Sequence, residues 1–168
     1  KAQQELLLSS LQDSSPTETA ALTQRRAVIG PGVTVTLDDA PFDFGLDAQV
    51  DPNATVVHQQ DVDAVMNALW RGGAEFMAIQ DIRITARTPV RCIGNVILVG
   101  SASYAPPYHI QAVGDVSGML DALDTDPTIA TYRADAARYG LGWDVEVKSD
   151  LHLPAAVDPA ALQYVKEA

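Results

Sequence analysis

One helix, predicted over residues 62–70, constrains the fold more than any other segment of the sequence. Apolar side chains recur there at helical spacing and are Val62, Val65, Met66, Leu69 and Trp70. That spacing places them on one face of an α-helix. Asp61 is the expected N-cap, and Gly72-Gly73 supplies the left-handed conformation at which helices end. Because one apolar face has to be buried, the helix predicts a packed domain.

Segments with β-strand alternation surround this helix. We predict strands over residues 33–37, 75–85, 91–99, 108–113 and 143–148, a loop over 101–107, and a second helical region over 115–139 that restarts at Asp126-Pro127. Gly94-Asn95 is expected to form either a tight turn or a bulge. The apolar run Val96–Val99 favours a central, buried strand. This order predicts an α+β domain, a ferredoxin-like antiparallel sheet with helices on one face.

The residues before this domain favour helix. Leu7, Leu8 and Leu11 lie at helical spacing, and a new helix is expected to begin at Ser15-Pro16. Gly30-Pro31-Gly32 is expected to end it. We therefore divide the chain into a helical stalk or coiled-coil end over residues 1–29 and an α+β domain over residues 30–168, with a short helix expected after residue 158.

Charge and cysteine content restrict the partners. The 168 residues contain 22 Asp and Glu but 11 Lys and Arg, which gives a net charge of −11. A field of that sign repels phosphate backbones, so nucleic acid is not an expected partner. Cys92 is the only cysteine, so no internal disulfide can form. Its apolar surroundings favour a buried, inert thiol over a nucleophile.

The sequence contains no recognisable catalytic or metal-binding motif. The three histidines, His58, His109 and His152, lie in different predicted elements without the close spacing of a zinc site. No cofactor is expected, because the glycine-rich phosphate motifs are missing. An enzyme of unrecognised type would have to use His58, Asp61 or Asp81, and its side chains would have to meet in the fold.

Three arginines are concentrated around the turn at Thr88-Pro89 of this acidic chain. They are Arg83, Arg87 and Arg91. Strand alternation would let Arg83 and Arg91 face one side together, where two guanidinium groups suit a carboxylate or a phosphate. The alternative is cross-strand pairing with the chain's own aspartates.

A second candidate surface is the segment of Tyr104, Pro106, Pro107 and Tyr108. Its aromatic and proline content is typical of a surface that docks a partner, or of a stiff connection whose rings are packed.

Many of these residues also resemble a known family in their order and spacing. The shared residues are Gly30–Val33, Asp38-Asp39, Pro41, Val57, Asp61, Asn67–Leu69, Gly73–Glu75, Arg83, Arg91–Asn95, Pro106–Tyr108 and Ala112–Asp115. They resemble the YlxW-like family of uncharacterised, membrane-anchored proteins of Gram-positive bacteria, whose domain has no known function. We add Asn95 to the candidate binding residues.

The resemblance implies a setting for the domain. Proteins of that family have an N-terminal membrane span, a coiled-coil stalk and a domain outside the membrane, with a suspected link to cell division or envelope assembly. The chain begins at Lys1, so we expect a single membrane span upstream of it. The resemblance also implies that the domain lies on the extracytoplasmic side, that its partners are proteins of the cell envelope, and that the stalk can form homo-oligomers. The expected function is non-catalytic binding or scaffolding. The alternatives are a sensor of a small anionic ligand at Arg83 and Arg91, or an unrecognised enzyme.

Overall fold

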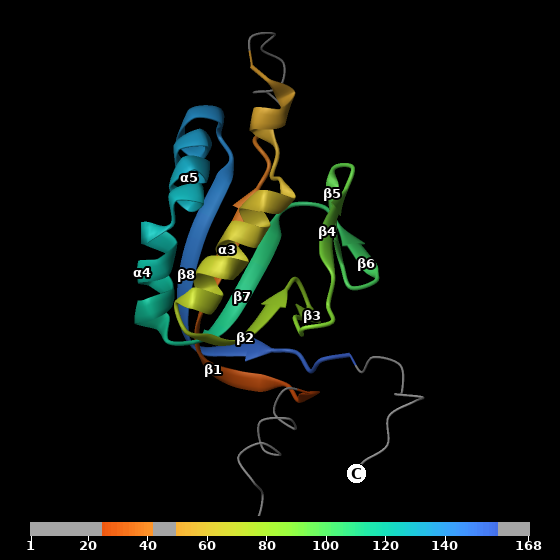
Figure 1. Cartoon of the computed structure of the whole chain (residues 1–168), viewed down its shortest axis with the longest axis vertical. Helices are drawn as coiled ribbons and strands as arrows, with labels where there is room; N and C mark the ends of the chain where they lie inside the picture. Colours follow the sequence, from red (N-terminus) through yellow and green to blue (C-terminus); the bar gives the residue numbers. More distant parts are fainter. Residues whose placement is uncertain (1–24, 42–49, 158–168) are drawn as a thin grey trace, which may run out of the picture.

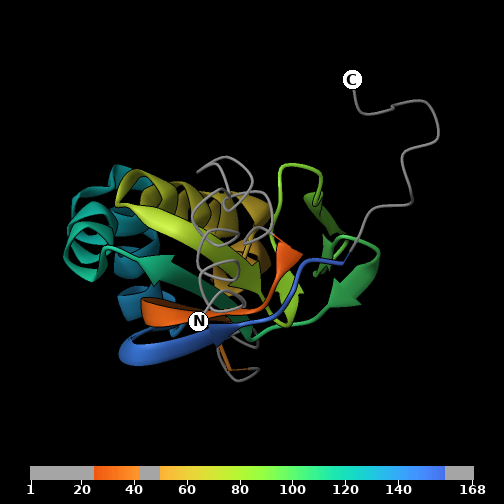
Figure 2. The same cartoon turned by 90° about the horizontal axis from the view of Figure 1, so that it is seen from below.

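The computed structural model describes residues 25–41 and 50–157 of the chain. These residues form a mixed α+β structure with three α-helices, a five-stranded sheet and a three-stranded sheet. The helices lie together on one face of the larger sheet, and the smaller sheet stands beside it (Figure 1). The view from below shows the helix layer and the larger sheet from another side (Figure 2). The predicted α+β class and antiparallel pairing are therefore confirmed.

The larger sheet has the strand order β3-β2-β7-β1-β8, and every neighbouring pair in it is antiparallel. Its strands are β1 (Val28–Asp38), β2 (Ala74–Ile79), β3 (Ile82–Arg83), β7 (Tyr108–Gly114) and β8 (Gly142–Leu153). The middle of the sheet is apolar, with Val35 of β1 opposite Ile110 of β7 and Val145 of β8.

The first strand begins earlier than the sequence suggested. Residues 28–30 belong to β1 and not to the end of a helix. Gly30-Pro31-Gly32 lies inside this strand, where the register with β8 shifts. Residues 1–24 of the stalk predicted over residues 1–29 lie outside the described residues, as does the short helix predicted after residue 158.

Helix α3 (Gln59–Arg71) carries the apolar face expected from the sequence. Val62, Val65 and Leu69 are buried against the sheet, whereas Trp70 at the end of the helix is 38% exposed. The prediction of Asp61 as N-cap is wrong, because the helix begins three residues earlier, at Gln59, with His58 as N-cap. Asp61 lies in the first turn, and its Oδ2 accepts the backbone N–H of His58 at 2.8 Å. Such a reciprocal bond belongs to a capping box, which the sequence pattern around Asp61 did not indicate.

Helices α4 (Val116–Thr125) and α5 (Pro127–Tyr139) begin and end where the sequence predicts. The side chain of Asp115 accepts the backbone N–H of Gly118, and that of Asp126 accepts the N–H groups of Thr128 and Ile129. Gly140 ends α5 in the left-handed conformation at φ 83°. A short 3-10 helix, η2 (Pro52–Thr55), precedes α3.

Two predicted long strands are hairpins. Residues 75–85 fold back at Gln80, which has a φ of 54°, so β2 and β3 pair with each other. Residues 91–99 contain β4 (Val90–Ile93) and β5 (Val96–Val99), joined by the turn at Gly94-Asn95. With β6 (Ala102–Tyr104), in the segment expected to be a loop, they make the smaller sheet. The apolar run at residues 96–99 is central only in this smaller sheet, and only its alternate residues Ile97 and Val99 are buried.

The ends of the two longest strands cover part of the sheet face that has no helices. Between Gly30 and Gly32 of β1, β8 carries an extra residue, so the pair is bulged there. Beyond the bulge, Leu151 and Leu153 pack with Ala78 and Val113 in a small second apolar cluster, separate from the main core beneath the helices. Ala78 of this cluster stands opposite Arg83 of β3.

Candidate functional site

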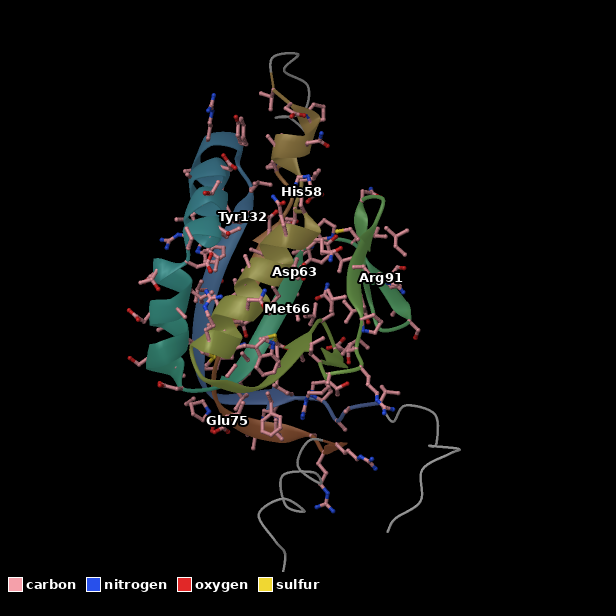
Figure 3. The ribbon with its side chains drawn as sticks, in the orientation of Figure 1. His58, Asp63, Met66, Glu75, Arg91 and Tyr132 are labelled. Carbon is pink, nitrogen blue, oxygen red and sulfur yellow. The ribbon has the colours of Figure 1, made fainter. Side chains whose placement is uncertain are left out.

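The two arginines expected to share an exposed face lie in different environments. Arg83 is 3% exposed and stands opposite Ala78 on the helix-free side of β2. Its Nη2 donates to the backbone oxygen of Arg26 at 2.6 Å, and its guanidinium carbon lies 4.9 Å from the centre of the Phe76 ring. Burial lowers the pKa of Arg83 from its ordinary value of 12.5. Arg91, in contrast, is exposed on β4 (Figure 3).

This placement corrects the expectation of a paired guanidinium face. A carboxylate or phosphate from solvent would have to displace the chain around Arg26 before it reached Arg83. Strand alternation predicts the side of β3 on which Arg83 lies, but it does not predict the contact with the distant backbone at Arg26. The geometry therefore gives no support to an anion sensor at Arg83 and Arg91.

The aromatic and proline segment is also turned mainly inward. Tyr108 is buried, and burial followed by the charge of Asp39 raises the pKa of Tyr108 to about 12. Tyr104 packs against the main core. Pro107 is exposed, and its backbone oxygen accepts the side-chain N–H of Gln80 at 3.1 Å. The rings are thus used for packing, which favours a stiff connection over a docking surface made by the tyrosines.

Of the three residues considered for catalysis, the fold brings together His58 and Asp61. Their Nδ1 and Oδ2 atoms are 3.7 Å apart at the start of α3. Burial raises the pKa of Asp61, although the backbone N–H of His58 opposes that shift. Asp81 is exposed in the turn between β2 and β3. The close pair has a structural task, because the same Asp61 oxygen closes the first turn of the helix.

An open groove that the sequence did not reveal lies between the start of α3 and the smaller sheet. We call it the α3–β4 groove. Its volume is ≈ 720 Å³. Three separate segments line it, namely residues around η2, the first turns of α3, and the end of β4 with its turn: Pro52, Asn53, Val56, Val57, His58, Gln59, Gln60, Asp63, Cys92, Gly94 and Asn95. Of the residues expected to bind a partner, Asn95 is part of this groove.

One side-chain bond of Gln59 joins the two sides of the groove, and a second lies within α3. Its Oε1 accepts the backbone N–H of Cys92 at 2.9 Å, and its Nε2 donates to Oδ2 of Asp63 at 3.3 Å. The segment before α3 is held by Asp39, whose Oδ1 accepts the backbone N–H of Val57 at 2.8 Å. The groove therefore has a fixed base between the helix and the smaller sheet. Figure 3 shows His58 and Asp63 along α3, with Arg91 on the smaller sheet beside them.

The groove has an acidic character. Asp63 is the carboxylate in its lining, and Asp61 lies nearby in the same helix turn. Burial raises the pKa of the Cys92 thiol, and the charges of Asp63 and Asp61 raise it further. The thiol is therefore protonated at neutral pH, which does not suit a nucleophile. Amide side chains and the apolar surfaces of Val56 and Val57 make up much of the remaining lining.

Residues 25–41 and 50–157 contain neither a metal-binding cluster nor a membrane-spanning helix. No group of three or more His, Cys, Asp and Glu side chains among them has an arrangement that could hold a metal ion. In the same part of the chain, no helix has the length and apolar character needed to cross a membrane.

Comparison with known proteins identifies the family. Residues 17–166 match the model of a family described as a bacterial protein of unknown function, DUF881. The chain belongs to the DUF881 family. The relatives include the UPF0749 proteins MT1871 and Rv1823 from two strains of Mycobacterium tuberculosis, each 34% identical over 132 residues. The UPF0749 protein YlxW of Bacillus subtilis is 31% identical over 97 residues, which confirms the predicted resemblance.

These DUF881 relatives are longer than this chain. The matched regions cover 76% of this chain but 43% of MT1871 and of Rv1823, and 58% of this chain but 41% of YlxW. The solved structure of an uncharacterised conserved protein from Mycobacterium tuberculosis shares the fold. It has a TM-score of 0.67 and 25% sequence identity, and the alignment covers 89% of this chain and 96% of that one. The chain therefore spans less than half of the curated relatives it matches.

Proposed function

We propose that this DUF881 domain is a non-catalytic protein-binding module that holds an extended segment of a partner in the α3–β4 groove. The observation that carries the proposal is the groove itself, which is open, ≈ 720 Å³ in volume, and lined by three chain segments. Pockets that combine apolar walls with a few placed polar groups are suited to specific recognition. The amides of Asn53, Gln60 and Asn95 are available for hydrogen bonds to a partner backbone, since all three residues are exposed.

The chemistry of the lining favours a partner segment with basic and apolar side chains. Asp63 contributes a negative charge, and the described residues that line the groove include no Lys or Arg. The whole chain has a net charge of −11, which adds attraction at a distance for a basic partner. Val56, which is half-buried, offers apolar contact in the same lining.

We place this module outside the membrane of a cell, on a single-pass anchor, with a role in cell division or envelope assembly. The support for this setting is the resemblance to YlxW-like proteins. A helical stalk over residues 1–29, which could also bring copies together, belongs to the same proposal. The order β8-β1-β7-β2, with α3 following β1 and α4 and α5 following β7, supports a ferredoxin-like description of the domain.

The binding proposal is tested by adding positive charge to the groove. In the protein expressed in its own cells, Asn53→Arg with Gln60→Arg is expected to abolish co-purification of crosslinked partners, because two cations would repel a basic segment. Both positions are exposed, so the melting temperature should remain close to that of the wild type. The matched control is Ala130→Arg with Ala137→Arg, which adds the same charge at exposed positions of α5.

Loss of the crosslinked partners in the groove variant but not in the control supports the proposal. Equal recovery in both variants refutes it. The topology has its own test, since protease added to intact spheroplasts should digest an extracytoplasmic domain. Survival of the domain under conditions that digest a known exposed protein would contradict the proposed side of the membrane.

A further inference from the structure

Strand β8 forms one edge of the larger sheet among the described residues. It pairs with β1 on one side and has no neighbouring strand on the other in the order β3-β2-β7-β1-β8. Residues 146–150 along it are all exposed. An edge strand presents a row of backbone N–H and C=O groups to which another strand can add. Within residues 25–41 and 50–157, the outer edge of β8 is thus open for pairing.

The bulge restricts which part of β8 can accept a strand. Gly32 pairs with Lys148 and Gly30 with Leu151, so Ser149 and Asp150 lie together opposite one residue of β1. The strand bends at such a point, and its regular pairing is interrupted. The regular segment of the edge therefore runs from Gly142 to Lys148.

The two faces of this segment differ. Trp143 and Val145 pack against the core on the helix side, whereas Asp144, Glu146 and Lys148 alternate with them and point to the helix-free side. On the helix side, a groove of ≈ 330 Å³ runs between the edge of β8 and helices α4 and α5. The lining of this second groove is Leu120, Leu123, Asp124, Arg133, Trp143, Asp144, Val145 and Val147. Val147 is 52% exposed, which leaves apolar surface uncovered beside the open edge.

We propose that this edge binds a second copy of the chain, with the two β8 strands antiparallel and Glu146 at the two-fold axis. In this register Asp144 lies opposite Lys148 of the partner subunit, and Val145 lies opposite Val147 of the partner subunit, each pair occurring twice. Residues opposite each other in an antiparallel pair point to the same face. The helices of both copies consequently remain on one side of a continuous sheet, and the valines add apolar contact beside the second groove.

The charges select this register over its neighbours. Moving the axis to Val145 would set Asp144 opposite Glu146, with two pairs of like charge. Moving it to Val147 would set Glu146 opposite Lys148 but also Asp144 opposite Asp150, and would require the bulged residues in the ladder. With the axis at Glu146, the single like-charge pair is that of the two Glu146 side chains. It is moderated by Lys148, whose Nζ lies 3.2 Å from Oε2 of Glu146 in the same chain.

Charge exchange tests this interface by sedimentation equilibrium of the 168-residue chain. Asp144→Lys and Lys148→Glu should each weaken self-association by about tenfold or more, because two facing pairs change from attraction to repulsion. The double variant should recover wild-type association, and so should an equimolar mixture of the two single variants, in which both facing pairs are again opposite in charge. The controls Asp121→Lys and Arg87→Glu change the net charge equally at exposed sites away from β8.

The register has an additional test in Glu146→Gln. This change should strengthen the dimer when Glu146 faces itself, and should weaken it when Glu146 faces Lys148 of the partner subunit. Association through residues 1–29 would not respond to these charges. A wild-type chain that remains monomeric at about 1 mM overturns the proposal, as do single variants that associate like their controls. Neither outcome affects the proposed α3–β4 groove, which is formed by other residues.

Discussion

Arg83 gives the sharpest stability prediction, because its buried position reverses the role expected from the sequence. Arg83→Met keeps much of the apolar stem but removes the guanidinium group. The charge-assisted hydrogen bond to the Arg26 backbone oxygen is worth about 1.5–3 kcal/mol. The contact with the Phe76 ring is worth about 0.5–2 kcal/mol. Part of this is offset, because Met does not require a charge to be buried.

We therefore expect Arg83→Met to lower the free energy of unfolding by about 2 kcal/mol, with a fall in melting temperature of roughly 4–8 °C for a chain of this size. Urea unfolding measures the change as a shift in midpoint at an unchanged slope. The matched control is Arg91→Met, at an exposed position, which should remain within about 0.5 kcal/mol of the wild type. Equal stabilities of the two variants would refute a structural role for Arg83.

Three further predictions concern the stability of the domain. Asp126→Asn preserves a cap for α5 but loses the 2.6 Å ion pair with Arg71, so it should cost about 1 kcal/mol at neutral pH. Burial would raise the pKa of Asp126, but the backbone hydrogen bond from Ile129 and the Arg71 guanidinium lower it below 3.8. The loss of stability caused by Asp126→Asn should therefore disappear as the pH falls below 3.8 and through the folded-state pKa. Urea unfolding across that pH range measures it. The pH dependence at Asp61 has the opposite sign, because burial raises its pKa above 3.8. Ionisation of Asp61 then lowers the stability of the folded chain as the pH rises through that higher pKa. Asp61→Asn should therefore gain stability relative to the wild type between acidic and neutral pH. Gly32→Ala would press its Cβ against the backbone oxygen of Ala112, which should lower the free energy of unfolding by about 2 kcal/mol or more in thermal unfolding. A variant as stable as the wild type would show that β1 and β7 can separate at that point.

The sequence predicted those parts of the fold that depend on nearby residues. The apolar face of α3 and the caps at Asp115 and Asp126 follow from local spacing and short-range hydrogen bonds, and the structure has them. The hairpin at Gln80 was missed because apolar alternation continues on both sides of the turn. Its left-handed conformation occurs at a residue other than Gly or Asn, which gives no turn signal in the sequence.

The candidate site was less accessible to sequence reasoning, because it depends on contacts between distant segments. Alternation indicated a strand face for Arg83, but the backbone oxygen to which its guanidinium donates belongs to Arg26, 57 residues away in the chain. The α3–β4 groove joins residues from η2, α3 and β4 that share no motif. Asn95 entered the candidate set through the family resemblance, and it is the residue from that set that lines the groove.

Photo-crosslinking from position 95 tests the central claim of a binding groove most directly. A photoreactive amino acid at Asn95, introduced into the protein in its own cells, should yield a discrete adduct with a partner protein. The same probe at Ala137, exposed on α5 and outside the groove, should yield none of that adduct. The adduct from position 95 should be lost with Asn53→Arg and Gln60→Arg. No adduct from position 95, or an adduct of equal yield from position 137, would contradict the account.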